Sequence, residues 1–202
     1  MKLVVATFNR GKLAELAALL DRPGLELVSL ADVPGTRPVD ETGSTLTENA
    51  LLKARAALAR TGLPAIGDDT GLEVDALDGA PGVHSARWAG PGATDRDNVR
   101  KLLEAMSGVG PERRTARFRT VCAASFPDGR TVTAEGVLEG RIVERPRGTG
   151  GFGYDSVFEI PSLGRTLAEL SADEKNARSH RAQAVRELAA RLDRAAPKPS
   201  GL

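Results

Sequence analysis

Apolar and polar positions along the first half of the chain switch between strand-like and helix-like spacing. Residues 2–6 are an apolar run typical of a buried strand, and residues 26–29 can form a second strand. Between them, apolar residues recur at helical spacing at Leu13, Leu16, Ala17 and Leu20. Residues 31–43 are interrupted by proline and glycine and are predicted to be a loop. A helix then follows to about Arg60, with Thr45 and Glu48 as a capping box.

The second half combines a hairpin pattern with two more helices. Thr94 and Asp97 are predicted to cap a helix that ends at about Met106. Residues 113–126 and 131–143 each alternate polar and apolar side chains around a turn, which predicts an antiparallel hairpin or meander. The last helix is expected to follow a capping box and a charged stretch at residues 171–181, and residues 195–202 are expected to be a frayed, flexible tail.

This order of elements predicts the fold class. Strands alternate with helices in the first half, and a hairpin is inserted before the final helix, which favours an α/β fold with a mixed sheet. A chain of 202 residues can form one large domain or two lobes that share a core.

Candidate chemistry centres on the stretch Gly67 to Glu73, which follows the apolar run Leu63 to Ile66. We expect a strand to end at Ile66, so that Asp68 and Asp69 lie at its end beside glycines that allow close approach. Adjacent carboxylates in such a place suit a metal ion. The alternative is a turn in which both aspartates bind local backbone N–H groups.

Three further stretches suit a phosphorylated ligand. Residues 7–12 join a strand to a helix, and Asn9 as N-cap together with Lys12 could receive a phosphate. Residues 148–155 form the densest glycine run, which favours close backbone approach to a ligand over a linker. Residues 173–181 place lysine, histidine and arginine just before the apolar stripe of the last helix.

Composition narrows the classes of partner. The formal net charge is +1, so the chain as a whole does not attract nucleic acid or anionic lipid, and any anion needs a local cluster. Cys122 is the only cysteine, which excludes an internal disulfide and favours a reducing compartment. No apolar run is long enough to span a bilayer, and the expected location is the cytoplasm. His84 has no partner at metal-ligand spacing and is expected to be a surface or structural residue.

Together these motifs resemble one family, the inosine triphosphate pyrophosphatases, over nearly the whole chain. The resemblance rests on Thr7-x-Asn9-x-x-Lys12, Glu41-Thr42-Gly43 with Glu48-Asn49-Ala50 and Lys53, Gly67 to Leu72, Gly148 to Asp155, and Glu174-Lys175-Asn176-x-x-Ser179-His180-Arg181. These enzymes hydrolyse non-standard purine nucleoside triphosphates such as ITP, dITP and XTP to the monophosphate and pyrophosphate. The chain departs from the family pattern at Ser156, where proline is common, and at Phe8, where a small residue is common.

The resemblance implies an elongated, two-lobed α/β domain at residues 1–194, built around a long mixed sheet flanked by helices. It also implies a substrate cleft between the lobes, a Mg²⁺ cofactor and a homodimer. Asp69 would be the catalytic carboxylate, and Glu41 and Asp69 would hold the metal, with Asp68 supporting and Asp40 as a substitute for Glu41.

The resemblance also implies which residues bind the substrate, namely Thr7, Phe8, Asn9, Arg10, Gly11, Lys12, Lys53, Thr70, Phe152, Gly153, Tyr154, Asp155, Lys175, His180 and Arg181. The lysines would neutralise the phosphates, and Phe152 would stack on the purine. His180, Arg181 and Asp155 would contact the edge of the base. Donors there satisfy the oxygen at position 6 of hypoxanthine and are left unpaired by the amino group of adenine, a mismatch that can cost about 10⁴-fold or more.

Two rival functions remain open at this point. A Maf-type nucleotide pyrophosphatase would share the phosphate chemistry, but is not expected to combine Ser179-His180-Arg181 with the loop that carries Phe152. A nucleotide-binding or RNA-binding protein without hydrolysis would use the arginines at residues 113–119. Interleaved glutamates and the lack of stacking aromatics make that stretch more typical of a solvated sheet face.

Overall fold

A single mixed sheet runs through the computed structural model, which describes residues 2–21 and 23–195. In this part of the chain the strands are β1 (Lys2–Val5), β2 (Glu26–Ser29), β3 (Ala65–Val74), β4 (Pro81–Gly82), β5 (Thr115–Ser125), β6 (Thr131–Ile142), β7 (Phe158–Ile160) and β8 (Arg165–Thr166). Their order is β2-β1-β3-β5-β6-β7-β8, with β4 beside β3. β1 is parallel to β2 and β3, and the other pairs are antiparallel. The predicted mixed α/β fold is confirmed.

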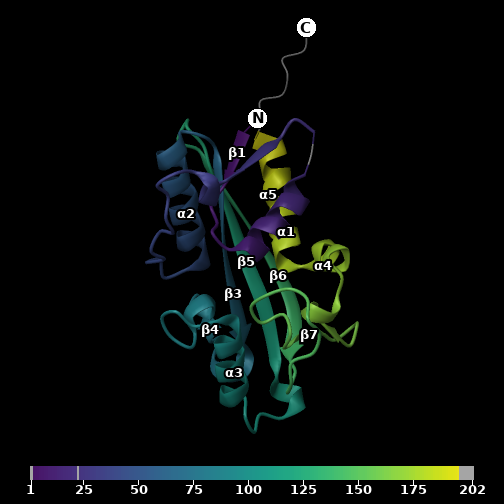
Figure 1. Cartoon of the computed structure of the whole chain (residues 1–202). Coiled ribbons are helices and arrows are strands. Elements are labelled where there is room, and N and C mark those ends of the chain that lie inside the picture. The colour runs from purple at the N-terminus through teal and green to yellow at the C-terminus, as the bar shows by residue number, and fades with distance from the viewer. Residues whose placement is uncertain (1, 22, 196–202) are drawn as a thin grey trace.

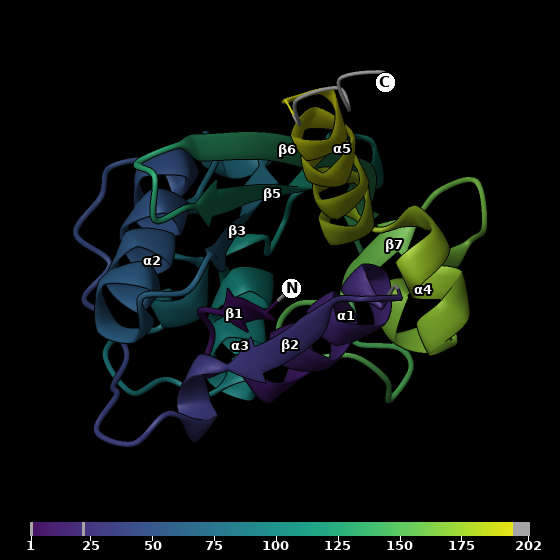
Figure 2. The same cartoon turned by 90° about the horizontal axis from the view of Figure 1, so that it is seen from above.

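Helices cover both faces of the sheet. They are α1 (Arg10–Leu20), α2 (Leu46–Thr61), α3 (Asp95–Ala105), α4 (Ala172–Arg178) and α5 (His180–Ala195). In Figure 1 the strands β3, β5 and β6 run along the length of an elongated molecule, with α1, α2 and α5 toward one end and α3 toward the other. Seen from above in Figure 2, α2 lies on one side of the sheet and α1, α4 and α5 lie on the other. None of the helices in the described ranges is both long and apolar enough to cross a membrane.

Glycine allows two helices to lie unusually close to the sheet. A side chain at Gly67 of β3 would collide with the backbone of Ala50 and Ala54 in α2. A side chain at Gly136 of β6 would collide with the backbone of His180 at the start of α5. The helices that carry Lys53 and His180 are therefore held against the central strands.

The strand that we expected to end at Ile66 in fact continues. β3 extends to Val74, and each of its residues from Ala65 to Val74 pairs with β5. The predicted strand end, and the alternative of a turn at Asp68 and Asp69, are both wrong. Glycine and aspartate are poor strand formers, but the long ladder with β5 satisfies the backbone of this segment and outweighs local preference.

The other predicted elements agree with the structure except near the C-terminus. The hairpin of β5 and β6, the capping boxes of α2 and α3 and the N-cap Asn9 are confirmed. The charged stretch before the last helix forms a helix of its own, α4, and Ser179 separates it from α5. Ser179 is extended, and its hydroxyl accepts from the backbone N–H of Ala182. Of the predicted tail, Ala195 ends α5 and residues 196–202 lie outside the described residues.

Candidate active site

The cleft lies at a gap along one edge of β3. On that edge β1 pairs only with Ala65 and Ile66, and β4 pairs only with Leu72 and Glu73. Between these contacts, residues 67–71 have no strand partner on that side in the described part of the chain. The loop after β1 leads from the same point into α1. Ligands of open α/β sheets commonly bind where neighbouring connections diverge in this way.

Asp68 and Asp69 are adjacent but serve different sides of the strand, because successive side chains in a strand point to opposite faces. Asp68 is buried, and Lys12 Nζ and Arg181 Nε contact its Oδ2 at 3.1 and 3.2 Å. Burial alone would raise the pKa of Asp68, but Lys12, Arg181 and Lys53 outweigh it and hold that pKa far below its usual value. Its Oδ1 is buried without a hydrogen-bond partner among the described residues.

Asp69 instead faces α2. Its Oδ1 accepts from Lys53 Nζ at 2.8 Å, and its Oδ2 accepts from Asn49 Nδ2 at 3.2 Å. Burial raises the pKa of Asp69, and Lys53 and Lys12 offset only part of that effect. Burial would lower the pKa of Lys53, but the attraction of Asp69, Glu41 and Asp68 outweighs it, so the ammonium group stays charged.

Glu41 approaches the same lysine from the loop before α2. Lys53 Nζ contacts Glu41 Oε1 at 2.5 Å, and Arg87 contacts Glu41 Oε2 at 2.9 Å. Burial would raise the pKa of Glu41, but these two cations outweigh it and lower the pKa. Asp40 is exposed and does not line the cleft, whereas Glu41 does. Glu41 is therefore better placed than Asp40 to act as the second metal ligand.

One part of the cleft, with a volume of about 210 Å³, lies beside the loop after β1. We call it the phosphate end, and Thr7, Phe8, Asn9, Lys12 and Lys53 are among the residues that line it. Asn9 caps α1 by accepting the backbone N–H of Lys12 at 3.0 Å. Of the residues predicted for this end, Arg10 is exposed and lines neither part of the cleft.

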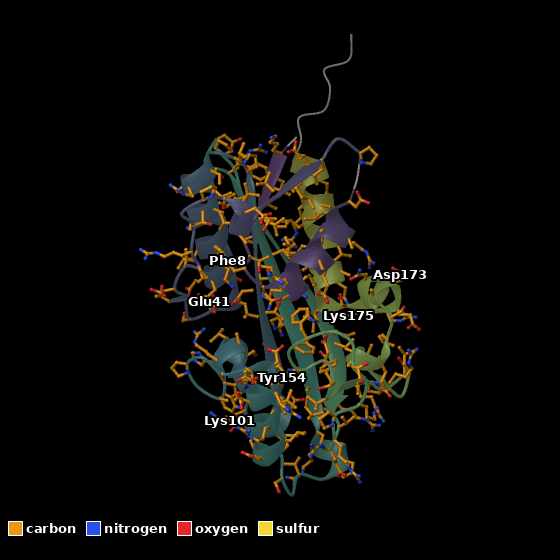
Figure 3. All side chains as sticks on the ribbon, viewed as in Figure 1. Phe8, Glu41, Lys101, Tyr154, Asp173 and Lys175 are labelled. Atoms are coloured by element: carbon orange, nitrogen blue, oxygen red, sulfur yellow. The ribbon has the colours of Figure 1, made fainter. Side chains whose placement is uncertain are left out.

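The adjoining part, with a volume of about 110 Å³, is the base end. Its predicted residues come together here: Thr70, Phe152, Gly153, Tyr154, Asp155, Lys175, His180 and Arg181. Figure 3 shows Glu41 and Lys175 reaching toward the middle of the molecule from different elements, with Tyr154 below them.

The glycine-rich loop is fixed to its surroundings by several contacts. The Phe152 ring lies 4.7 Å from Lys175 Nζ and 5.7 Å from the Arg181 guanidinium carbon. A side chain at Gly11 would collide with this ring, so the loop packs against the first turn of α1. Asp155 Oδ2 accepts from Lys175 Nζ at 2.5 Å and from the Phe152 N–H at 2.9 Å.

The sequence analysis missed several residues of this region, among them Glu15, Asp95 and Ser85. Glu15 of α1 forms ion pairs with Lys175 Nζ at 2.7 Å and with Arg181. Its spacing of three residues from Lys12 could have placed it on the same helix face. Asp95 accepts the Gly153 N–H at 2.7 Å, and the Ser85 carbonyl accepts the Tyr154 hydroxyl at 2.9 Å. No local sequence signal indicates these two contacts.

His180 is held at the base end by two neighbours on β5. Its Nδ1 lies 2.6 Å from Thr120 Oγ1, and its ring stacks on Phe118 with the centroids 4.7 Å apart. Burial lowers the pKa of His180 well below its usual value, and the nearby Arg181 and Lys175 lower it further. The imidazole is therefore neutral at physiological pH. His84, in contrast, is exposed, as expected.

Two of the arginines proposed as an RNA-binding face, Arg117 and Arg119, are paired with carboxylates, and a third, Arg114, is buried and donates to backbone carbonyls. Arg117 contacts Asp75 and Glu139, and Arg119 contacts Glu73 at 3.0 Å. These pairs cancel much of the positive charge that a nucleic-acid backbone would need.

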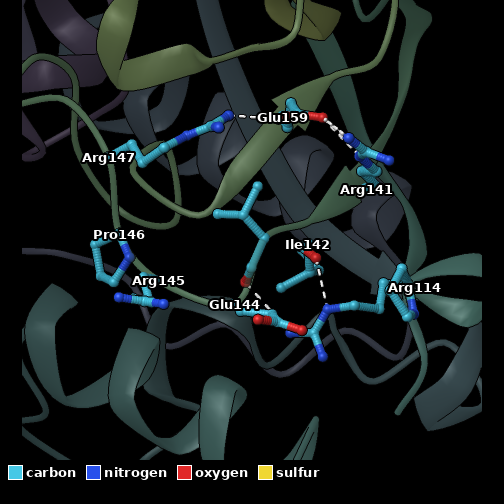
Figure 4. A pocket seen from close by; sticks show the side chains of 10 residues that line it. Arg114, Arg141, Ile142, Glu144, Arg145, Pro146, Arg147 and Glu159 are labelled. Carbon is cyan, nitrogen blue, oxygen red and sulfur yellow. Dashed lines mark hydrogen bonds and ion pairs between the residues drawn. The ribbon is translucent and has the colours of Figure 1, made fainter.

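A second hollow lies where β5 begins and β6 ends, and its volume is about 520 Å³. Figure 4 shows Arg141 and Arg147 both reaching Glu159. Arg114 donates to the backbone carbonyl of Ile142 at 2.7 Å. The described residues that line the hollow include no aromatic ring on which a base could stack, so the hollow suits a nucleoside triphosphate less well than the cleft does.

Comparison with known proteins agrees with this geometry. The chain matches the model of the Ham1 family over residues 3–191. It is similar to a dITP/XTP pyrophosphatase of Geobacillus kaustophilus, with 52% identity over 187 residues that cover 93% of this chain and 92% of that protein. A dITP/XTP pyrophosphatase of Symbiobacterium thermophilum is 53% identical over 191 residues, covering 95% and 94%. The fold is similar to that of a HAM1 protein from Coxiella burnetii, with a TM-score of 0.86, 43% identity and coverage of 96% and 99%.

Proposed function

The chain belongs to the Ham1 family, and on that premise we propose that it hydrolyses dITP, XTP and ITP to the monophosphate and pyrophosphate. One observation carries the proposal. A single cleft joins a phosphate end with two lysines and Glu41 to a base end with an aromatic ring and hydrogen-bond donors, and Asp69 lines the second part.

The reaction needs a proton acceptor beside the α-phosphorus. A water oxygen bonds to that phosphorus, while the bond from the phosphorus to the bridging oxygen of the β-phosphate breaks and pyrophosphate leaves. Asp69 is suited to accept the proton of the water, because its carboxylate lines the cleft. Lys12 and Lys53 offset the charge of the phosphates.

Glu41 and Asp69 fit a Mg²⁺ ion. Both contact the one ammonium group of Lys53, at 2.5 and 2.8 Å, so the two carboxylates already share a cation. Within residues 2–21 and 23–195 no group of three or more His, Cys, Asp or Glu side chains could hold a metal alone. Mg²⁺ is commonly held by one or two carboxylates together with substrate phosphates, and when bound it offsets charge on the reacting phosphoryl group. Mg²⁺ is therefore the proposed cofactor.

The residues that line the base end support the proposed preference for oxopurines. Phe152 offers a face for stacking, and His180 and Arg181 offer donors to an oxygen at position 6 of the purine. Asp68 ties this end to the phosphate end, because its Oδ2 contacts both Lys12 and Arg181.

Two further parts of the proposal concern assembly and location. The resemblance to inosine triphosphate pyrophosphatases supports a homodimer, for which light scattering should give the mass of two chains. A monomer at micromolar concentration would contradict it. The single, fully buried cysteine Cys122 supports a cytoplasmic location, which fractionation of cells that produce the untagged protein can test.

Separation of the reaction products tests the proposed chemistry. With ITP and Mg²⁺, we expect IMP and pyrophosphate in equal amounts. IDP with orthophosphate would place the attack at the γ-phosphorus and overturn the proposal. Bound but unchanged ITP would favour the rival nucleotide-binding protein.

A further inference from the structure

Two threonine hydroxyl groups, one half-buried at Thr70 and one buried at Thr120, connect Arg181 to His180 at the base end. Arg181 donates to Thr70 Oγ1 at 3.0 Å, and Thr70 Oγ1 lies 2.7 Å from Thr120 Oγ1. Thr120 Oγ1 in turn lies 2.6 Å from His180 Nδ1. Thr70 and Thr120 are directly paired across β3 and β5. Thr120 is 0% exposed and His180 is 3% exposed, so water does not compete for the contact between these two residues.

Each threonine hydroxyl has a single proton, so the chain can be directed in two ways. In the first, Thr70 donates to Thr120, and Thr120 donates to His180 Nδ1. In the second, His180 donates from Nδ1 and Thr120 donates to Thr70, and the acceptor left for the Thr70 proton among the described residues is Asp68 Oδ2 at 3.4 Å. Hydroxyl donors normally lie within about 3.0 Å of their acceptor. Only the first direction uses short contacts alone, of 2.6 to 3.0 Å.

We propose that Thr120 donates its hydroxyl proton to Nδ1 of His180 and thereby fixes the imidazole as the tautomer that carries its proton on Nε2. Thr120 is then a positioning residue for the specificity of the cleft. The inference rests on the proposed function, because it assigns a role in recognising the oxopurine of that substrate.

The tautomer decides what the histidine offers to a base. A neutral imidazole donates from one ring nitrogen and accepts at the other. His180 lines the base end, and its Nε2 has no hydrogen-bond partner among the described residues. With the proton on Nε2, that atom donates to an oxygen at position 6 of the purine. With the proton on Nδ1, Nε2 would accept, and would suit the amino group of adenine instead.

The surroundings keep the ring in this orientation. Phe118 lies two residues before Thr120 on β5, so both side chains point to the same face of the sheet. Phe118 stacks on His180 at an interplanar angle of 26°. The absence of a side chain at Gly136 allows the start of α5 to lie close enough for the contact with Thr120.

Nuclear magnetic resonance of the full-length wild-type protein, labelled with ¹⁵N in histidine, tests the tautomer directly. The sequence has only two histidines, and a His84→Gln variant assigns the signals. At neutral pH we expect the signals of His180 to show a proton on Nε2 and an unprotonated, hydrogen-bonded Nδ1. A proton on Nδ1 overturns the inference, whichever nucleotides the protein hydrolyses.

Paired variants test the consequence for specificity. Thr120→Val removes the hydroxyl at nearly constant volume, and we expect the ratio of kcat/KM for ITP to that for ATP to fall at least about tenfold. Thr120→Ser keeps the hydroxyl and should restore both the ratio and the tautomer. Ser125→Ala is the matched control, because Ser125 is a buried residue of β5 whose hydroxyl has no partner in the described structure.

The outcomes separate this inference from the proposed function. An unchanged ITP-to-ATP ratio in Thr120→Val overturns the specificity role, as does an equal fall in Ser125→Ala. If Thr120→Val does not fold, the wild-type spectrum and Thr120→Ser still decide the matter. A wild-type protein that hydrolyses no oxopurine nucleotide overturns the proposed function, while the spectrum tests the tautomer on its own.

Discussion

Replacing Asp69 with asparagine should separate catalysis from folding. The substitution keeps the shape of the side chain but removes its negative charge and its ability to take a proton from water. General base catalysis contributes about 10²- to 10⁴-fold. We expect kcat for ITP to fall at least about 10²-fold, which corresponds to about 2.7 kcal/mol.

Stability should change far less than activity. Burial raises the pKa of Asp69, so the folded protein binds a proton there more readily than the unfolded chain does. At neutral pH the ionised carboxylate therefore lowers stability, and asparagine removes that cost. Against this, asparagine offers one oxygen where aspartate offers two, to Lys53 and Asn49. The lost acceptor costs about 1 kcal/mol, and the expected change in Tm is within about 4 °C.

Steady-state kinetics and thermal melting of the same preparation test both parts. Asp173→Asn is a suitable control, because Asp173 is an exposed residue of α4 that does not line the cleft. Figure 3 shows its position beside α4. A folded Asp69→Asn protein that hydrolyses ITP within a few-fold of wild type would refute the reasoning. Glu41 and Asp68 would then be the next candidates for the base.

Three other results are expected. Lys53→Ala should lower the turnover of ITP and of ATP to the same extent, because Lys53 lines the phosphate end. A tenfold change in the ratio of kcat/KM for ITP to that for ATP, about 1.4 kcal/mol, would contradict this division of the cleft. Exhaustive chelation of Mg²⁺ should abolish turnover, and full turnover after chelation would contradict the metal requirement. Thiol reagents and Cys122→Ala should leave turnover intact, because Cys122 is buried and burial raises its pKa well above the usual value. A folded but inactive Cys122→Ala protein would contradict this second claim. The free energy of unfolding should fall as the pH drops through about 6.5, the pKa of histidine in the unfolded chain, because the pKa of His180 in the folded protein is lower and the unfolded chain takes up the proton first. His180 contributes a slope of at most about 1.4 kcal/mol per pH unit. A His180→Gln variant with the same slope as the wild type would contradict this expectation.

Elements with local signals were predictable from the sequence. The β5 and β6 hairpin follows from strict alternation around a turn, and the start of α2 follows from its capping box. Asn9 was correctly expected to cap α1. Each of these features depends on residues within a few positions of one another, so the pattern alone determines them. The family resemblance inferred from the motifs is likewise confirmed.

Features set by distant segments were not predictable. β3 continues through Asp68 and Asp69 because β5, about fifty residues later, supplies a complete ladder of backbone partners. The same ladder sends the two carboxylates to opposite faces, whereas the sequence suggested that they act together. Helical spacing could place Glu15 on the same face as Lys12, but it cannot indicate the ion pair with Arg181, which lies 166 residues further along the chain.

The chemistry of the site was predicted more fully than its architecture. Residue types that suit phosphates, a metal and a purine edge are visible in the sequence, and most of them line one cleft. The electrostatic environment of these residues could not be predicted, because it depends on which charged side chains are in contact in the folded protein. Arg117 and Arg119 illustrate the point, since carboxylates on neighbouring strands and loops neutralise a stretch that looks basic in sequence.

A panel of nucleoside triphosphates, compared by kcat/KM with Mg²⁺ and with pyrophosphate release as the signal, tests the central claim most directly. The account predicts that ITP, dITP and XTP are the best substrates and that ATP is poorer by at least about tenfold, because an amino group at position 6 leaves the donors of the base end unpaired. Preference for pyrimidine or other modified nucleotides would favour the Maf-type rival and contradict the assignment of the base end. Equal turnover of ITP and ATP would contradict it as well.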